Sequence, residues 1–192
     1  WLASMDSTCV SRLQPKTPTG DFLFQQTIID DVVRGFRQSD RGKAIMACGT
    51  GKTLVGLWSA EALESQRTLI LVPSLSLIAQ VSQMWLENAS APFNSLFVCS
   101  DETAASDSFV GQTHELGVPV TTDPEDIKNF LLRDGRRVVF ATYQSSPRVA
   151  EAQAIGAPGF DLTIADEAHH CTGNMGSHFK TVLDGERLRS DK

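Results

Sequence analysis

The sequence predicts an α/β fold with a mainly parallel sheet covered by helices on both faces. Short, almost continuously apolar runs alternate along the chain with longer segments whose apolar residues recur every three or four positions. The apolar runs lack polar alternation, which is typical of strands buried on both faces of a parallel sheet. The 192 residues, 41% of them hydrophobic, suffice for one domain with a sizeable core and are few for two.

The first elements follow from local composition and periodicity. Residues 1–20 carry two prolines and a glycine without sustained periodicity, so we predict a linker or tail there and an ordered domain over 21–192. Apolar residues at helical spacing predict an amphipathic helix over 25–38. A short apolar run at 44–47, interpreted as a strand, leads into a glycine loop, and a second helical pattern covers 52–65.

The same alternation of strands and helices continues downstream. Residues 100–121 are polar, small and irregular, which indicates a surface excursion. A helix is predicted to begin near Pro124, because a capping Thr or Asp precedes this proline. Gly135 is the predicted end of the helix. Strands are predicted at 68–72, 95–99, 137–143 and 161–167, and helices at 75–88, after Pro124 and around 149–154.

Composition excludes several classes of protein. The formal net charge of −6 and pI near 5.2 rule out a globally basic surface, so any contact with nucleic acid must be local. The four cysteines show no C-x-x-C spacing and fit a reducing cytoplasm better than a disulfide scaffold. The longest apolar stretch, 68–79, is interrupted by Pro73 and by serines and is too short to span a bilayer. We therefore expect a cytoplasmic protein.

The stretch "IMACGTGKT", residues 45–53, ends like a nucleotide-binding loop. The strict pattern G-x-x-x-x-G-K-[ST] has glycine where this chain has Met46. Its two glycines allow backbone amides to turn toward an anion, and a helix that begins near Lys52 adds its dipole. Lys52 would reach the β- and γ-phosphates, and the Thr53 hydroxyl would bind Mg²⁺. The predicted nucleotide-binding residues of the loop are Cys48, Gly49, Thr50, Gly51, Lys52 and Thr53. Without an acidic partner, the segment is equally compatible with an ordinary turn.

That acidic partner is present in "LTIADEAHH", an apolar strand that ends in Asp166 and Glu167. Asp166 would bind the metal, usually through water, and Glu167 would act as the general base that activates the attacking water. Adjacent carboxylates repel one another unless a cation is present, so the pair favours a metal site over a solvated turn. With Lys52, they are the predicted catalytic residues.

A zinc site is the other reading of this region. The nearby residues with zinc-binding side chains are His169, His170, Cys171 and His178. Adjacent histidines point in diverging directions, and no second Cys or His pair stands at finger-like spacing. The pattern therefore favours the carboxylate site.

Taken in order, these motifs resemble the first RecA-like domain of superfamily 2 helicases and translocases. "MACGTGKT" is similar to their motif I, whose leading glycine is commonly replaced, and "DEAH" at Asp166–His169 is similar to their motif II. "LVPSLSLIAQ" at 71–80 resembles motif Ia, and "ATYQS" at 141–145 resembles the Thr-containing motif that follows motif Ib. "FLFQQTIIDDV" resembles the adenine-reading Q-type motif through Gln25, with Leu23 in place of the usual proline.

In detail the motifs look most like the helicase domain of bacterial type ISP and related restriction, or phage-defence, enzymes. The resemblance implies a three-layer RecA-like P-loop NTPase domain that uses ATP and Mg²⁺. It implies DNA backbone contacts, a second RecA-like domain of the same polypeptide and, in many relatives, fused nuclease and methyltransferase domains. The implied nucleic-acid contacts are Ser74, Thr142, Gln144 and Ser145. Gln25 would read adenine, and His169 would couple the ATP site to the second domain.

The resemblance also implies that the complete enzyme hydrolyses ATP and that this chain alone does so poorly. Motif III, the second domain and its arginine finger are absent from the sequence, and such a finger contributes several orders of magnitude to hydrolysis. We expect the chain alone to bind ATP weakly and hydrolyse it poorly.

Three alternatives stay open at this point. The first is a P-loop ATPase or kinase that does not act on nucleic acid. The second is an RNA helicase, because no residue here reads a 2′-hydroxyl. The third is an interaction module in which residues 100–121 bind a protein partner and the nucleotide is structural.

Overall fold

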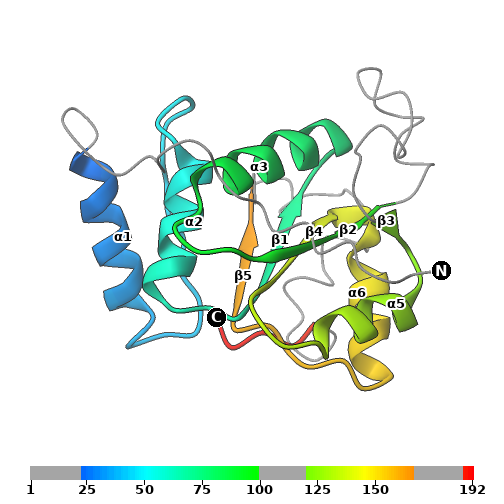
Figure 1. Ribbon diagram of the computed structural model, residues 1–192. Coiled ribbons are helices and arrows are strands. Elements are labelled where there is room, and N and C mark those ends of the chain that lie inside the picture. The colour runs from blue at the N-terminus through cyan, green and yellow to red at the C-terminus, as the bar shows by residue number, and fades with distance from the viewer. Residues whose placement is uncertain (1–22, 100–119, 167–187) are drawn as a thin grey trace, which may run out of the picture.

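The structure is a computed structural model that describes residues 23–99, 120–166 and 188–192. A single sheet of five strands runs through these residues in the order β3-β2-β4-β1-β5 (Figure 1). Every neighbouring pair is parallel, as predicted. The strands are β1 (Arg67–Val72), β2 (Asn94–Val98), β3 (Val120–Thr121), β4 (Arg137–Thr142) and β5 (Leu162–Ala165).

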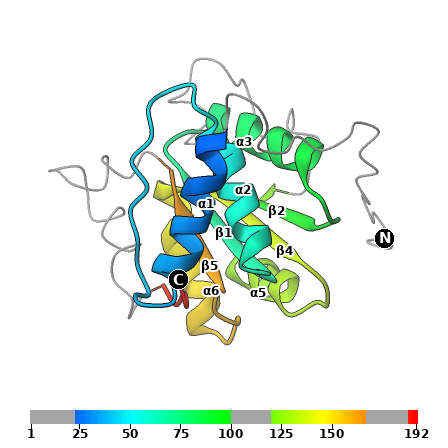
Figure 2. The same cartoon turned by 90° about the vertical axis from the view of Figure 1, so that its left-hand side faces the viewer.

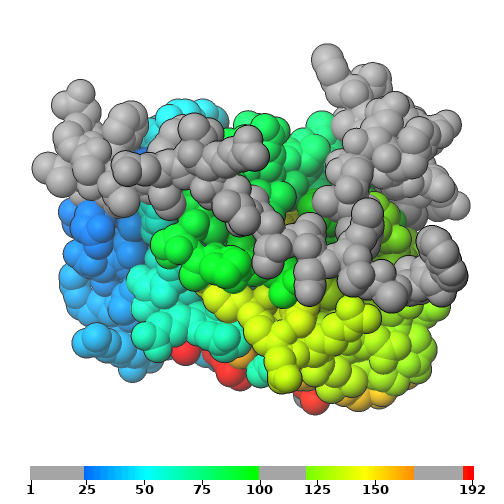
Figure 3. Space-filling model, in the orientation of Figure 1, coloured from blue at the N-terminus to red at the C-terminus, as the bar shows by residue number. Residues whose placement is uncertain are grey.

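Helices cover both faces of this sheet and give the predicted three layers. They are α1 (Leu23–Gly35), α2 (Lys52–Ala62), α3 (Leu75–Asn88), α5 (Pro124–Leu131) and α6 (Ser146–Ala154), the last preceded by the 3-10 turn η3 (Tyr143–Ser145). Helices α2 and α3 pack on one face, and α5 and α6 on the other. Helix α1 packs on the outside of α2 (Figure 2). The blue surface of α1 and the yellow-green surface around α5 therefore lie at opposite ends of the view in Figure 3.

Alternate residues of each strand feed two separate cores. In β1, Ile70 and Val72 pack among the residues of α2 and α3, whereas Leu69 and Leu71 pack among those of α5 and α6. This is the period-2 alternation of a strand buried on both faces, and it explains why the strands appear as continuous apolar runs.

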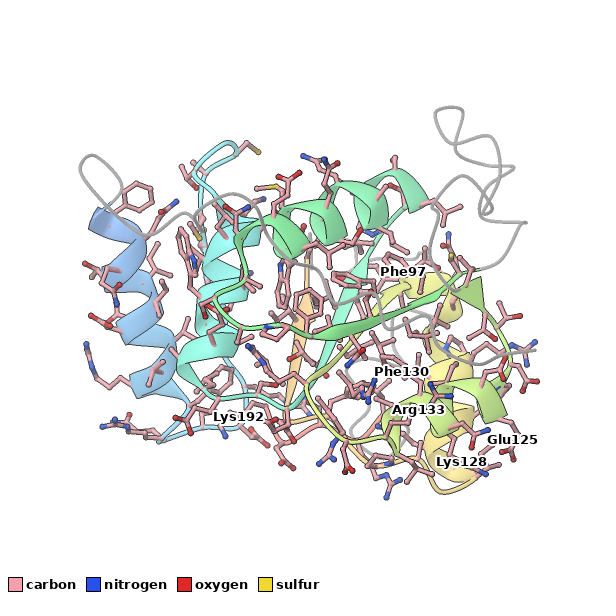
Figure 4. All side chains as sticks on the ribbon, in the orientation of Figure 1. Phe97, Glu125, Lys128, Phe130, Arg133 and Lys192 are labelled. Carbon is pink, nitrogen blue, oxygen red and sulfur yellow. The ribbon has the colours of Figure 1, made fainter. Side chains whose placement is uncertain are left out.

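The core under α3 contains an aromatic cluster. Trp85 packs edge-on against Phe140 with ring centroids 6.0 Å apart, and Phe140 stacks on Phe97 at 5.3 Å. Phe97, labelled in Figure 4, belongs to β2, and all three side chains are at most 2% exposed. The cluster thus ties α3 to two neighbouring strands.

Helix α5 begins as its sequence predicts. Asp123 caps the helix by accepting a hydrogen bond from the Glu125 amide at 2.9 Å, and Pro124 occupies the first turn. On the same helix the Lys128 ammonium pairs with the Glu125 carboxylate at 2.6 Å. The guanidinium of Arg137, from β4, lies 5.2 Å from the centre of the Phe130 ring of this helix. Figure 4 labels Glu125, Lys128 and Phe130 along this helix.

The start of β1 is bound to the start of β5 through one carboxylate. The Asp161 side chain accepts hydrogen bonds from the amides of Gln66, at 2.6 Å, and Arg67, at 2.8 Å. It also pairs with the Arg67 guanidinium at 3.5 Å. The two strands are therefore fixed in register from their first residues.

The predicted strand at 44–47 is not formed, so that prediction is wrong. Ile45 is 85% exposed, and Met46 is half-buried. A strand needs a neighbour for its backbone groups. Among the described residues, β5 pairs with β1 on one side, and on its other side the Thr163 amide donates to the Lys192 carbonyl. In this part of the chain the apolar run pairs with no strand, and its backbone forms no ladder.

No helix in the described ranges combines the length and the apolar character that crossing a bilayer requires.

We predict that Phe140→Ala lowers the free energy of unfolding of this chain by about 3–5 kcal/mol, because it empties the centre of the aromatic cluster. Leu132→Ala is the control: its side chain is 60% exposed, and its loss changes stability by less than about 0.5 kcal/mol. Urea unfolding followed by tryptophan fluorescence measures both. Equal losses in the two variants would contradict the assigned core.

Candidate nucleotide-binding site

The glycine loop before α2 has the backbone conformation that its sequence predicts. Gly49 and Gly51 have φ values of +78° and +83°, in the left-handed region that favours glycine. Gly51 caps α2 without a side-chain hydrogen bond. The Thr50 hydroxyl donates to the Ala47 carbonyl at 2.7 Å and closes the loop on itself. The two glycines are thus required by the turn itself.

Gln25 of α1 holds this loop from outside. Its side chain is 4% exposed, and Nε2 donates to the Thr50 carbonyl at 2.8 Å. A Cβ atom at Gly51 would lie 2.4 Å from the same nitrogen, so only glycine leaves room for the contact. The amide nitrogen of Gln25 therefore contacts the loop, while its role in reading adenine stays a prediction.

The start of α2 is electrostatically suited to an anion. The amides of Leu54 and Val55 both donate to the Gly51 carbonyl, which sets the first helical turn, and that turn contains no acidic residue. The first turn of α2 therefore adds no negative side chain of its own to the positive end of the helix dipole. Lys52 and Thr53 are half-buried at this position. These features fit a bound phosphate group.

Asp166 lies at the same edge of the sheet as this helix start. Its amide donates to the Leu71 carbonyl at 2.9 Å and extends the β1–β5 ladder by one residue. Helix α2 passes β5 closely, since a Cβ at Gly56 would lie 3.5 Å from Cδ1 of Ile164. The helix and the strand run in opposite directions (Figure 1), so the first turn of α2 and the end of β5 come to one edge. This is where a parallel sheet binds its ligands.

The four predicted nucleic-acid contacts differ in how far their side chains are exposed. Thr142 and Ser145 are 0% and 4% exposed, and the Thr142 hydroxyl donates to the Ser145 hydroxyl at 3.1 Å. Gln144, between them, is exposed. Ser74 is half-buried and caps α3 by accepting from the Leu77 amide at 3.4 Å. Phosphate contact by these residues stays a prediction, and Gln144 has the most accessible side chain.

Some predicted site residues lie outside the described residues. They are the proposed base Glu167, the coupling residue His169 and the zinc-type side chains His170, Cys171 and His178. In the ranges that are described, no three His, Cys, Asp or Glu side chains come together as a metal-binding group.

Two buried aromatic residues that the sequence did not single out also bond to the backbone of the site. The Trp85 indole donates to the Thr53 carbonyl at 3.2 Å, across 32 residues of sequence. The Tyr143 hydroxyl donates to the Asp166 carbonyl at 2.7 Å. A single tyrosine within "ATYQS" was the available signal, but its bonding partner depends on the tertiary structure.

Comparison with known proteins shows the family to which this fold and this loop belong. The sequence model of the family described as "Type III restriction enzyme, res subunit" matches residues 22–187. The chain belongs to this family.

Similar proteins agree with this assignment. A protein of African swine fever virus named "Probable helicase A859L" is 30% identical over 160 residues, which are 83% of this chain and 17% of the relative. The protein of the same name from a second isolate is 30% identical over 161 residues. The chain thus spans about 17% of the length of these curated relatives.

Two solved structures have the same fold. The "ATP-dependent Type ISP restriction-modification enzyme LlaBIII bound to DNA" matches with a TM-score of 0.79 and 32% identity, over 93% of this chain and 12% of that one. A nuclease-deletion mutant of the Type ISP enzyme LlaGI, in complex with a DNA substrate mimic, matches with a TM-score of 0.74 and 34% identity, over 92% and 17%. The RecA-like fold and the resemblance to the helicase domain of type ISP enzymes are confirmed.

We predict that Gly51→Ala weakens nucleotide binding more than Gly49→Ala does. Both substitutions place a side chain at positive φ, at a cost of roughly 1–2 kcal/mol. Only the Gly51 variant also displaces Gln25, because a Cβ at Gly49 meets no atom within 4 Å. Binding of a fluorescent ATP analogue and the free energy of unfolding measure the two effects. If Gly49→Ala proved the more damaging variant, the contact of Gln25 with the loop would not matter for binding.

Proposed function

We propose that this chain is the ATP-binding motor domain of an ATP-dependent DNA helicase or translocase that forms part of a restriction enzyme. The observation that carries the proposal is the meeting of the glycine loop, the start of α2 and Asp166 at one edge of a parallel sheet. The two matching structures support it, because one is an ATP-dependent type ISP enzyme bound to DNA and the other is a type ISP enzyme in complex with a DNA substrate mimic.

The proposed ATP site assigns a role to each part of this edge. The loop amides around Gly49 and Gly51 and the dipole of α2 hold the phosphates, and the Lys52 ammonium pairs with the β- and γ-phosphates. Mg²⁺ would be held by Thr53 and Asp166, and its chemistry is to neutralise charge on the phosphates. Glu167 follows Asp166 directly and would take the proton of the attacking water.

The proposed DNA contact is local and directed to the backbone. With a net charge of −6, the chain has no broad basic field to draw DNA to its surface. Polar side chains at strand ends bind phosphates without such a field, and Gln144 is the exposed member of the predicted set. In the complete protein, a second RecA-like domain would close on ATP from the other side, and nuclease and methyltransferase domains would use the motion.

We predict that, in the full-length protein, Lys52→Ala lowers kcat for ATP hydrolysis by about 10²- to 10³-fold, because the transferred phosphate loses a charged partner. Glu167→Gln keeps nucleotide affinity and loses turnover, because the base is removed while the phosphate cradle is intact. Release of inorganic phosphate and binding of a fluorescent ATP analogue measure the two parameters separately. Hydrolysis by Glu167→Gln at the wild-type rate would show that another residue is the base.

A further prediction concerns Gln144. We expect Gln144→Ala to raise the concentration of linear duplex DNA needed for half-maximal ATPase stimulation about threefold to tenfold, as for loss of one hydrogen bond. Gln66→Ala is the matched control, since Gln66 is also exposed but lies before β1 at the opposite edge of the sheet. An equal change in the two variants would remove Gln144 from the interface.

The same assay separates the proposed function from its rivals. Stimulation by single-stranded RNA in place of DNA would assign an RNA helicase. ATP turnover that no nucleic acid stimulates would assign an ATPase or kinase of another kind.

A further inference from the structure

Tyr143 connects two parts of the proposed site that the sheet keeps apart. It lies in η3, directly after β4, and its side chain is 0% exposed among the apolar residues packed under α5 and α6. Its hydroxyl reaches the Asp166 carbonyl, after β5, at 2.7 Å. Strand β1 lies between β4 and β5, so this hydrogen bond joins residues that follow two strands which are not neighbours in the sheet.

The carbonyl that accepts this hydrogen bond belongs to the peptide group joining Asp166 to Glu167. The preceding peptide group is held as well, because the Asp166 amide donates to the Leu71 carbonyl at 2.9 Å. The backbone on either side of Asp166 is therefore fixed by β1 and by Tyr143. The direction in which the Asp166 carboxylate leaves the backbone depends on both bonds.

The backbone of Tyr143 lies in a turn that is stabilised by hydrogen bonds from hydroxyl groups. The Ser146 hydroxyl donates to the Tyr143 carbonyl at 2.8 Å, and Thr142 donates to Ser145 across the turn at 3.1 Å. All four of these residues are buried, whereas Gln144 is exposed. A displacement of Gln144 by a bound phosphate therefore moves a stiff turn that carries Tyr143 with it.

We propose that Tyr143 is the positioning residue through which DNA bound at Gln144 adjusts Asp166 and raises ATP turnover. The proposal rests on the proposed function, and it adds a physical route: a single hydroxyl that bonds to the backbone of the metal-binding residue. Tyr143 itself touches neither ATP nor DNA in this scheme.

The test is Tyr143→Phe in the full-length protein that contains this chain. The substitution removes one oxygen and keeps the buried ring. We expect kcat at saturating linear duplex DNA to fall about threefold to tenfold relative to kcat without DNA, as for loss of one buried hydrogen bond. The KM for ATP and the affinity for DNA stay unchanged, because neither ligand touches the hydroxyl.

Thr68→Val is the matched control for a merely structural effect. It also removes one buried hydroxyl, which bonds to the Ser65 hydroxyl at 2.7 Å, but it lies near the start of β1. We expect it to lower the thermal stability as much as Tyr143→Phe does and to leave the stimulation ratio unchanged. An equal fall of the ratio in both variants would overturn the proposal.

The remaining outcomes separate this inference from the function on which it rests. DNA stimulation in the wild type with an unchanged ratio in Tyr143→Phe overturns the inference alone. Absence of stimulation in the wild type overturns the proposed function and the inference together. Recovery of full stimulation in Tyr143→Phe at higher DNA concentration would make Tyr143 a DNA-binding residue and also overturn the inference.

Hydrogen exchange on the wild-type protein gives a second measurement that does not depend on a folded variant. We expect duplex DNA to slow amide exchange both in 143–146 and at Asp166, because the Tyr143 hydroxyl connects them. Protection of 143–146 without any change at Asp166 would overturn the inference.

Discussion

The hydrogen-bond ladder of β1 with its two neighbours is the constraint on which the rest of the molecule depends. Its register sets Val72 beside Thr142 on one side and Leu71 beside Ala165 on the other. Because all three strands are parallel, the residues that follow them leave the sheet at a single edge. That edge receives Ser74, Gln144 and Asp166 from strands far apart in the sequence, and α2 adds its glycine loop there. If one of these strands slipped by one residue against its neighbour, its side chains would change places between the two cores.

The site is secured from both faces of the sheet by aromatic side chains that donate to main-chain carbonyls. Trp85 reaches the first turn of α2 from the α2/α3 side, and Tyr143 reaches Asp166 from the α5/α6 side. A buried indole or phenol needs a hydrogen-bond partner, and in each case that partner is a backbone group of the site. Packing of the two cores and alignment of the site are therefore not independent, since a disturbance of either core moves one half of the site.

Much of the fold could be predicted because its signals are local. Helix α3 has the predicted bounds of 75–88, and α5 begins at Pro124 after a capping Asp123, since periodicity and capping act within a few residues. The run at 44–47 was wrongly predicted as a strand, because its apolar pattern is local while strand formation needs a partner. For the site, the loop conformation followed from its glycines. The contacts of Gln25 with Thr50 and of Tyr143 with Asp166 could not, because they join residues 25 and 23 positions apart through the tertiary structure.

The position of β5 beside β1 bears on how the protein is made. A ribosome adds β1 early and β5 late, with Arg67 and Asp161 separated by 94 residues. Until β5 has left the ribosome, the backbone groups along one side of β1, at Leu69, Ile70 and Leu71, have no partner strand. Such an unpaired apolar strand edge pairs readily with other chains. Asp166, the proposed Mg²⁺ ligand, directly follows the strand that closes this edge. The nascent domain therefore acquires its protection against aggregation and this proposed ligand at the same moment of synthesis.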